Sequence, residues 1–407
     1  MFSSKTDPIP PLRYDIQVIE VAQDGQDYLL FQDMLGYATE GFAIPAEMEP
    51  ILSLIDGSRS VQQLMPFVGE GATEEELLQY IQFLDQHRLL DSDFFAKSAE
   101  ETEDRYEASS IHHSNTAGGS YPDSPAELKS QLDEAFAKYE TSEPVSEAAA
   151  LYAPHIDPRV GMQSYVKAFS AIRNLKPNRV IMLGTSHYAG LYGDLYDNTP
   201  FIVSEKTFRL PNGEVRADSA FIHLMKNSLN SETHGVSFSD RAHRIEHSLE
   251  LHLLYLNHIW DHDFEIVPIL VGGMEDLLYM NNSHKEQQVN SFMEWIAAKT
   301  NNETIILISG DLAHFGRKFG DNTPASDMFE SVKAFDHTFL KLGADAKDFD
   351  LLEHIREDLD PYRVCGFPPL YSFLKTGLTD KGTILSYDLW DERERNSAVT
   401  FGSILYK

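Results

Sequence analysis

Three short apolar runs in the chain each end in a polar turn that carries a histidine. They are AAALYAPH, which ends at His155, RVIMLGTSH, which ends at His187, and TIILISGDLAH, which passes Asp311 and ends at His314. Short apolar runs of this kind predict strands buried on both faces, as in parallel sheets covered by helices. Because ligands bind beyond the carboxyl ends of such strands, we expect these side chains to share one site.

Strands and helices are predicted to alternate from residue 148 to the C-terminus. We expect strands at 149–154, 179–185, 265–272, 304–310, 383–389 and 398–406. We expect helices at 162–175, 245–260, 286–299, 325–342 and 364–376. This alternation is typical of a doubly wound α/β sheet.

The first 98 residues predict a separate small domain. Strand-like runs at 14–21 and 27–33 form a predicted hairpin, and three helical segments follow, two of them opened by capping boxes at Ser60 and Thr73. A strand-like run at 89–95 closes the unit. This order of elements predicts a small winged-helix-like domain. A DNA-binding role is disfavoured because the segment lacks a basic recognition helix.

Residues 99–116 are acidic, rich in serine and without periodicity, so they predict a linker. His112 and His113 lie inside it and are expected to be solvated loop residues. The α/β domain is then predicted to span residues 117–407.

The composition limits the partners of the chain. Its 407 residues carry 64 acidic and 33 basic side chains, a formal net charge of −31, which disfavours nucleic acid and anionic membranes. No apolar run approaches the roughly 20 residues that a membrane helix needs, and the first residues lack the apolar segment of a signal peptide. The single cysteine, Cys365, indicates a reducing compartment. We therefore expect a cytoplasmic protein.

The densest group of ionisable residues is RAHRIEHSLELH, between the second and third predicted strands of the α/β domain. On a helix, His243 and His247 would share a face with Glu250, and Glu246 would lie about 100° to one side. Such a face can supply a metal ligand, a general acid or base, or a carboxylate that orients a ligating imidazole. His243 to His247 also match the H-x-x-E-H pattern of inverted zinc peptidases, in which Glu246 would be the general base.

Other catalytic templates find no match in the sequence. No nucleophile elbow, Walker A loop or dinucleotide fingerprint follows a predicted strand. Cys365 is compatible with a nucleophile that has a histidine partner elsewhere, but a lone cysteine is more often a small buried apolar residue. We expect the second of these roles.

Eight segments in order along the chain resemble the Memo family, including the bacterial members called protein B of the AmmeMemoRadiSam system. The segments are AGGSYPDSPAEL (117–128), APHIDPRVG (153–161), LGTSH (183–187), EKTF (205–208), EHSLELHLLYL (246–256), IVPILVGG (266–273), ISGDLAHFG (308–316) and CGFPP (365–369). The resemblance implies the fold of class III non-haem iron extradiol dioxygenases.

The resemblance also implies a redox metal, iron or copper, held by His155 and His187. Animal members supply a third ligand from a cysteine, in a segment that aligns with GDLAHFG, where this chain has Ala313. Asp311, His314 or His247 is therefore expected to complete the site. Two imidazoles and a carboxylate form the facial triad of non-haem iron enzymes, and Asp311 or Glu246 would supply that carboxylate. Asp311 is the ligand we predict.

His247, Glu246 and His314 are the predicted acid–base residues of such a site. Three functions remain open. The first is a metal-dependent oxidoreductase of the dioxygenase type. The second is a non-catalytic accessory protein with a vestigial metal site, and the third is an inverted zinc peptidase. The pattern of residues 12–95 resembles the PqqD-like peptide-recognition domains that accompany radical-SAM enzymes, which implies a peptide or a radical-SAM protein as partner. A dimerisation or regulatory module without a ligand is the alternative for this segment.

Overall fold

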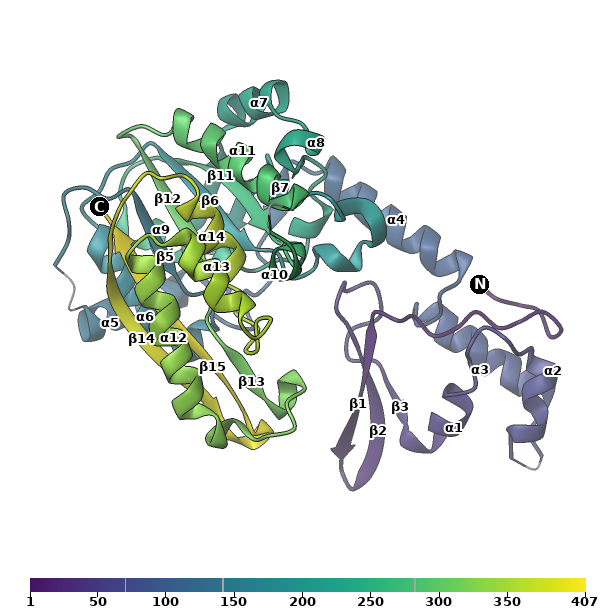
Figure 1. The fold of residues 1–407 in the computed structure, drawn as a ribbon. Coiled ribbons are helices and arrows are strands. Elements are labelled where there is room, and N and C mark those ends of the chain that lie inside the picture. The colour runs from purple at the N-terminus through teal and green to yellow at the C-terminus, as the bar shows by residue number, and fades with distance from the viewer. Residues whose placement is uncertain (70, 141–142, 282) are drawn as a thin grey trace. The chain divides into compact units, whose positions relative to one another are not determined.

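A computed structural model describes residues 1–69, 71–140, 143–281 and 283–407. The chain divides into two compact units, Met1–Ala108 and Ser109–Lys407 (Figure 1). Each has its own hydrophobic core.

The first unit is a small sheet packed against helices. Strands β1 (Ile16–Gln23), β2 (Gln26–Asp33) and β3 (Ala43–Pro45) pair antiparallel in that order. Helices α1 (Glu49–Leu52), α2 (Val61–Leu64) and α3 (Glu74–Gln86) follow, and α4 (Asp93–Ala108) ends the unit. The predicted hairpin and the capping boxes at Ser60 and Thr73 are confirmed.

Two expectations for the end of this unit are wrong. Residues 93–95 begin helix α4 instead of closing a strand, and only Leu90 forms an isolated bridge, to Leu12. Helix α4 also takes in residues 99–108, which looked irregular in sequence because their polar character hides the packing side of the helix. That side is held by Glu103, which is buried and accepts a hydrogen bond from Tyr37.

The second unit is built on a large mixed sheet. Within the described residues it contains 12 strands, whose main path runs β13-β15-β5-β12-β6-β11-β9-β8-β4. Its centre consists of β5 (Ala150–Ala153), β12 (Thr304–Ser309), β6 (Arg179–Thr185) and β11 (Glu265–Val271), which are mutually parallel. Three of these strands, β5, β6 and β12, are the ones predicted from the apolar runs, and β11 is the strand predicted at 265–272. All four point their carboxyl ends the same way.

The remaining strands extend this parallel centre on both sides. On one side lie β13 (His314–Gly316), β14 (Gly382–Glu392) and β15 (Ser397–Tyr406), with β15 antiparallel to β5. The strands of the other side are β4 (Ile111–His113), β7 (Phe201–Val203), β8 (Thr207–Leu210), β9 (Gly213–Ala217) and β10 (Val236–Ser237). His112 lies in β4 and is buried, so the expectation that it is a solvated loop residue is wrong, whereas His113 is exposed.

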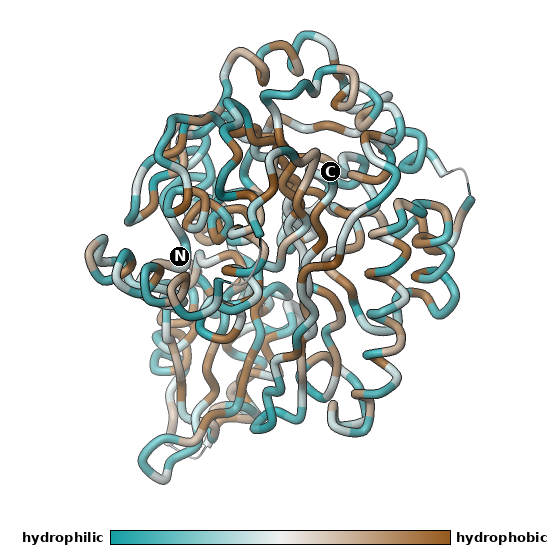
Figure 2. The backbone as a smooth tube through the Cα atoms, turned by 90° about the vertical axis from the view of Figure 1, so that its left-hand side faces the viewer, coloured by the Kyte–Doolittle hydropathy of each residue, from teal (hydrophilic) through white to brown (hydrophobic). Residues whose placement is uncertain are grey.

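Helices cover both faces of the sheet because side chains alternate along each central strand. Ile181 and Leu183 face a core shared with α7 (Ser219–Ser228), α11 (His284–Lys299), α12 (Phe329–Ala344), α13 (Asp348–Arg356) and α14 (Phe367–Leu374). Val180 and Met182 face the core of α5 (Pro125–Tyr139), α6 (Pro158–Ile172) and α9 (Glu250–Ile259). In Figure 2 the hydrophobic segments run through the interior as brown stretches, and the loops at the edges are mostly teal. The architecture is the expected α/β fold.

Two short helices, α8 (Ser231–His234) and α10 (Asp276–Tyr279), complete the unit. Within the described residues, no helix has both the length and the apolar character needed to traverse a lipid bilayer.

Candidate metal centre

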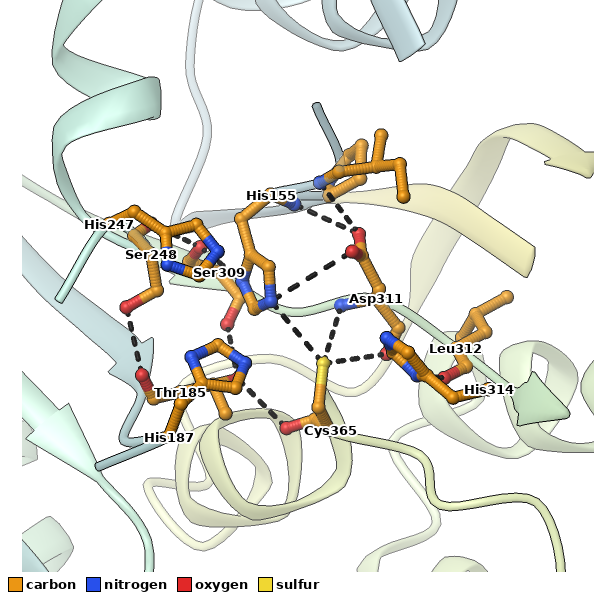
Figure 3. A network of polar contacts seen from close by, with 12 residues as sticks. His155, Thr185, His187, His247, Ser248, Ser309, Asp311, Leu312, His314 and Cys365 are labelled. Atoms are coloured by element: carbon orange, nitrogen blue, oxygen red, sulfur yellow. Dashed lines mark hydrogen bonds and ion pairs between the residues drawn. The ribbon is translucent and has the colours of Figure 1, made fainter. Parts of the chain in front are cut away.

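The carboxyl ends of the parallel strands carry the predicted polar side chains. His155 follows β5, His187 follows β6 and Asp311 follows β12. The cluster is completed by His247 and by Cys365, which comes just before α14 (Figure 3). Two sets of donor atoms each lie within 4.8 Å of one another. One set is His155, His187 and His247, and the other is His155, Asp311 and Cys365. His155 belongs to both sets and is the centre of the site.

A chain of two hydrogen bonds through the Ser309 hydroxyl determines which nitrogen of the His155 ring carries the proton. Ser309 Oγ lies 2.6 Å from the carbonyl oxygen of Ser248, which can only accept, so the Ser309 hydroxyl donates there. Nδ1 of His155 lies 3.1 Å from the same hydroxyl oxygen and therefore donates to it. This fixes the tautomer and leaves Nε2 unprotonated, the form that binds metals. Burial also lowers the pKa of His155 well below its usual value, so the ring stays neutral.

The sulfur of Cys365 faces that unprotonated nitrogen. Sγ lies 3.3 Å from Nε2 of His155 and accepts the backbone N–H of Asp311 at the same distance. Burial raises the pKa of the thiol. The approach depends on two glycines, because a Cβ at Gly310 would lie 2.2 Å from the Cα of Gly366. No real Cβ comes so close to backbone, so only glycine lets the two loops touch.

Asp311 holds the turn after β5 as well as bordering the cluster. Its Oδ1 accepts the backbone N–H groups of His155 and Ile156 at 3.0 and 3.1 Å. Its Oδ2 lies 3.9 Å from Nε2 of His155. Burial raises the pKa of this carboxyl to about 7, because the two backbone donors only partly offset the loss of solvation.

Glu246 orients His187. Its Oε1 accepts Nδ1–H of the His187 ring at 2.9 Å and the backbone N–H groups of His247 and Ser248 at 2.9 and 3.0 Å. Its Oε2 accepts the backbone N–H of His187 at 2.8 Å. Burial acts to raise the pKa of Glu246, but the His187 charge and these donors lower it to about 2. Burial of the His187 ring acts to lower its pKa, but the Glu246 carboxylate outweighs this effect and raises the pKa of His187 well above its usual value.

His247 lies beside the ring of His187. The two imidazoles stack with centroids 5.1 Å apart, and the His155 ring lies 5.5 Å from that of His247. Burial lowers the pKa of His247 to about 4, despite the nearby Glu246 carboxylate. His247 is therefore a neutral imidazole at the edge of the cluster, available as a ligand or as a proton acceptor.

The predicted helix over residues 245–260 is wrong in its first turn, and with it the shared face of His243 and His247. A 3-10 turn covers Arg241–His243, and α9 begins only at Glu250. The physical reason is that the Glu246 side chain accepts hydrogen bonds from the backbone N–H groups of His247 and Ser248. These local hydrogen bonds compete with those of a helix. His243 is buried with Nε2 bonded to the Ile202 carbonyl at 2.9 Å.

His314 lies beyond Asp311 at the rim of the cluster (Figure 3). Its Nδ1 donates to the carbonyl oxygens of Leu312 and Arg363 at 3.1 and 3.2 Å, which leaves Nε2 as an acceptor. Burial lowers the pKa of its ring to about 4. Glu250, by contrast, is buried and accepts hydrogen bonds from the backbone of Asn115 and Thr116 and from the hydroxyl of Tyr121. It anchors the start of the α/β unit.

Cys365 is the residue of this site that sequence reasoning missed. We expected it to be a small buried apolar residue, and Ala313 to occupy the place of a ligand. Ala313 instead packs with Phe315, Val332 and Ala398 in a small apolar cluster. The useful signal was the CGFPP segment itself, where a cysteine precedes a glycine and a helix that starts with proline.

The comparisons with known proteins agree with this fold. The family model described as Memo-like protein matches residues 112–405. The chain therefore belongs to the Memo-like protein family.

Its relatives are proteins of the same family. A MEMO1 family protein of Aquifex aeolicus is 26% identical over 387 residues, covering 93% of this chain and 96% of the relative. A MEMO1 family protein of Methanosarcina barkeri is 24% identical over 299 residues, covering 71% of this chain and 97% of the relative. Nearly the whole archaeal protein thus aligns with part of this chain, whereas the Aquifex relative aligns with most of both units.

Proposed function

We propose that the protein is a metal-dependent oxidoreductase whose cluster holds one redox metal ion, iron or copper. The observation that carries the proposal is the unprotonated Nε2 of His155, which Cys365, Asp311 and the histidines surround. Thiolate and imidazole suit copper and iron, and a carboxylate with two imidazoles suits non-haem iron. A bound metal of this kind would supply one-electron chemistry and activation of a small molecule such as oxygen.

His155 and His187 are the proposed ligands that both metals would share. Each has Nδ1–H committed to an oxygen acceptor, Ser309 for His155 and Glu246 for His187. This arrangement fixes the ring orientation and presents Nε2 to the metal. Asp311 or Cys365 is the proposed third ligand, because either places an anionic donor next to His155.

His247 and His314 are the proposed acid–base groups. Both are neutral imidazoles at the rim of the cluster, and their low pKa values make each a proton acceptor at neutral pH. Glu246 is a poorer base because its pKa is about 2 and its oxygens already accept four N–H groups. We therefore assign Glu246 the positioning of His187 and not the proton transfer that an inverted zinc peptidase would require.

Elemental analysis of protein purified without oxygen and without chelators tests the proposal. We expect about one iron or copper per chain, lost in His155→Ala and in His187→Ala. The third ligand is the residue whose variant, Cys365→Ser or Asp311→Asn, loses the metal. Zinc that survives both histidine variants, or no metal after reconstitution with ferrous or cuprous ions, would contradict it.

The first unit supports a proposed partner. Its hairpin and the helices after it are the elements on which the resemblance to PqqD-like peptide-recognition domains rests. We propose that residues 1–98 bind a peptide or a radical-SAM protein in the cytoplasm. Capture of such a partner from a lysate of the native host by the full chain, and its loss when residues 1–98 are removed, is the expected result.

A further inference from the structure

Two hollows meet beside the cluster, at the ends of β6 and β11. One has a volume of about 290 Å³ and the other about 260 Å³. Both are bordered by Ser186, His187 and the Gly272–Gly273 turn. The larger is close to the lower end of the size range of small-molecule sites, about 300 Å³. A ligand that spans the two hollows therefore passes His187.

The larger hollow is apolar on most of its wall, and the charged residues that line it are Glu275, Asp360 and Arg363. Its apolar border consists of Val271, Met274, Leu278, Val364, Phe367 and Pro368. Cys365 borders the same hollow, and its sulfur is the atom that lies 3.3 Å from Nε2 of His155. An apolar group in this space therefore lies directly against the cluster.

The smaller hollow contains a buried ammonium group. Lys285, in the first turn of α11, has a side chain only 11% exposed and borders this hollow. Among the described residues it forms an ion pair with Asp276, whose Oδ2 lies 3.8 Å from Nζ, beyond hydrogen-bond distance. Buried charges are normally paired and hydrogen-bonded. Lys285 thus has donors left for an anion.

A second polar group is unused at the same place. The hydroxyl oxygen of Ser186 is buried and has no hydrogen-bond partner among the described residues, and Ser186 borders both hollows. Asp197 and Glu275 also border the hollow of Lys285. With Asp276, three carboxylates lie around one ammonium, so a doubly charged phosphate is repelled more strongly than a singly charged anion.

We propose that the site takes a small amphipathic carboxylate. Its apolar group fills the hollow beside Cys365, and its carboxylate binds Lys285 and the hydroxyl of Ser186. This assignment names the substrate class of the proposed oxidoreductase and in that sense rests on the proposed function. The binding itself depends on the protein side chains and is measurable without the metal.

Calorimetric titration of the full chain tests the proposal with three probes. They are 3-phenylpropionate, its neutral amide, and phenyl phosphate, each titrated into chelator-treated and into iron-loaded protein. We expect 3-phenylpropionate to bind about tenfold or more tightly than the other two probes. The neutral amide cannot form a charge-assisted hydrogen bond with Lys285, and the second charge of phenyl phosphate is repelled by the carboxylates around Lys285. Lys285→Met should remove this preference and leave amide binding unchanged, while Lys285→Arg should keep it. Lys299→Met, at the exposed far end of the same helix, is the matched control.

The outcomes separate the two proposals. Equal binding of the carboxylate and the amide by wild-type protein overturns the inference, and so does tighter binding of phenyl phosphate. A carboxylate preference that persists in Lys285→Met overturns it as well. A preference seen in chelator-treated protein that cannot be loaded with iron or copper supports the inference and contradicts the oxidoreductase.

Discussion

The cluster contains two carboxylate–imidazole pairs that differ in the charge of the imidazole. In the pair of Glu246 and His187, the carboxyl has a pKa of about 2 and the imidazole has a raised pKa, so both groups are charged. In the pair of Asp311 and His155, the carboxyl has a pKa of about 7 and the imidazole has a lowered pKa, so the imidazole stays neutral.

Burial does not explain this difference, because Glu246 and Asp311 are both almost fully buried. The partners explain it: the charge of His187 lowers the pKa of Glu246 most, and the hydrogen bonds to the carboxylate lower it further. Glu246 accepts four N–H groups on its two oxygens, one of them from the His187 ring, whereas Asp311 accepts two on Oδ1. The neutral hydroxyl of Ser309 accepts the hydrogen bond from Nδ1–H of His155. The site thus offers a metal one imidazole that is already neutral and one that must first lose a proton.

The largest effect is expected from Glu246→Gln. The amide replaces an acceptor oxygen by a donor facing N–H groups, so we expect a loss of about 3–5 kcal/mol in the free energy of unfolding, as for other broken buried ion pairs. Urea unfolding at pH 7 measures it. Glu294→Gln, an exposed carboxylate on α11, is the control and should change stability little. Stability equal to wild type would show that the Glu246–His187 pair is not charged.

A smaller effect of opposite sign is expected from Asp311→Asn. The folded-state pKa of Asp311 is raised, so its contribution to stability is full below pH 4 and is lost as the pH rises through 7. The amide keeps an oxygen for both backbone donors, so chelator-treated Asp311→Asn should be more stable than wild type at pH 8 by about 2 kcal/mol. It should show no such gain at pH 4. Asp336, another buried carboxyl with a pKa of about 7, leaves some pH dependence in both proteins.

Ser309→Ala should weaken metal binding with a modest effect on folding. Without the hydroxyl, Nδ1 of His155 loses its acceptor and the tautomer is no longer fixed, so we expect metal affinity to fall about tenfold. Competition with a chromophoric chelator measures the affinity. Ser170→Ala is a matched control, since Ser170 is fully buried and its hydroxyl has no hydrogen-bond partner in the part of the chain described. An equal loss in both variants would argue against the hydrogen-bond chain through Ser309.

The smallest signal is the number of protons released on metal uptake. A charged His187 gives up about one proton when it becomes a ligand, and the Cys365 thiol gives up another if sulfur binds. Metal affinity should accordingly rise with pH. Titration in weakly buffered dye solution should count about two protons in wild type and about one in Cys365→Ser. Equal counts would exclude sulfur as a ligand.

The sequence was most informative where local patterns decide structure. The apolar runs before His155, His187 and His314 predicted three central strands, because burial on both faces demands continuous apolar residues. The approach of Cys365 was not predictable in this way, since it depends on a tertiary contact between Gly310 and Gly366. The irregular segment at Glu246 was missed because a side chain that binds its own backbone overrides helical periodicity.

The contact between His155 and Cys365 spans 210 positions in the chain. Closing so long a loop is entropically costly, and contacts of this range tend to form late in folding. No short fragment of the protein contains both partners, and neither half of the α/β unit can assemble the cluster alone. Ligand uptake at this centre is consequently a reporter of completed folding: during synthesis, the nascent chain cannot build the cluster until residue 365 has left the ribosome.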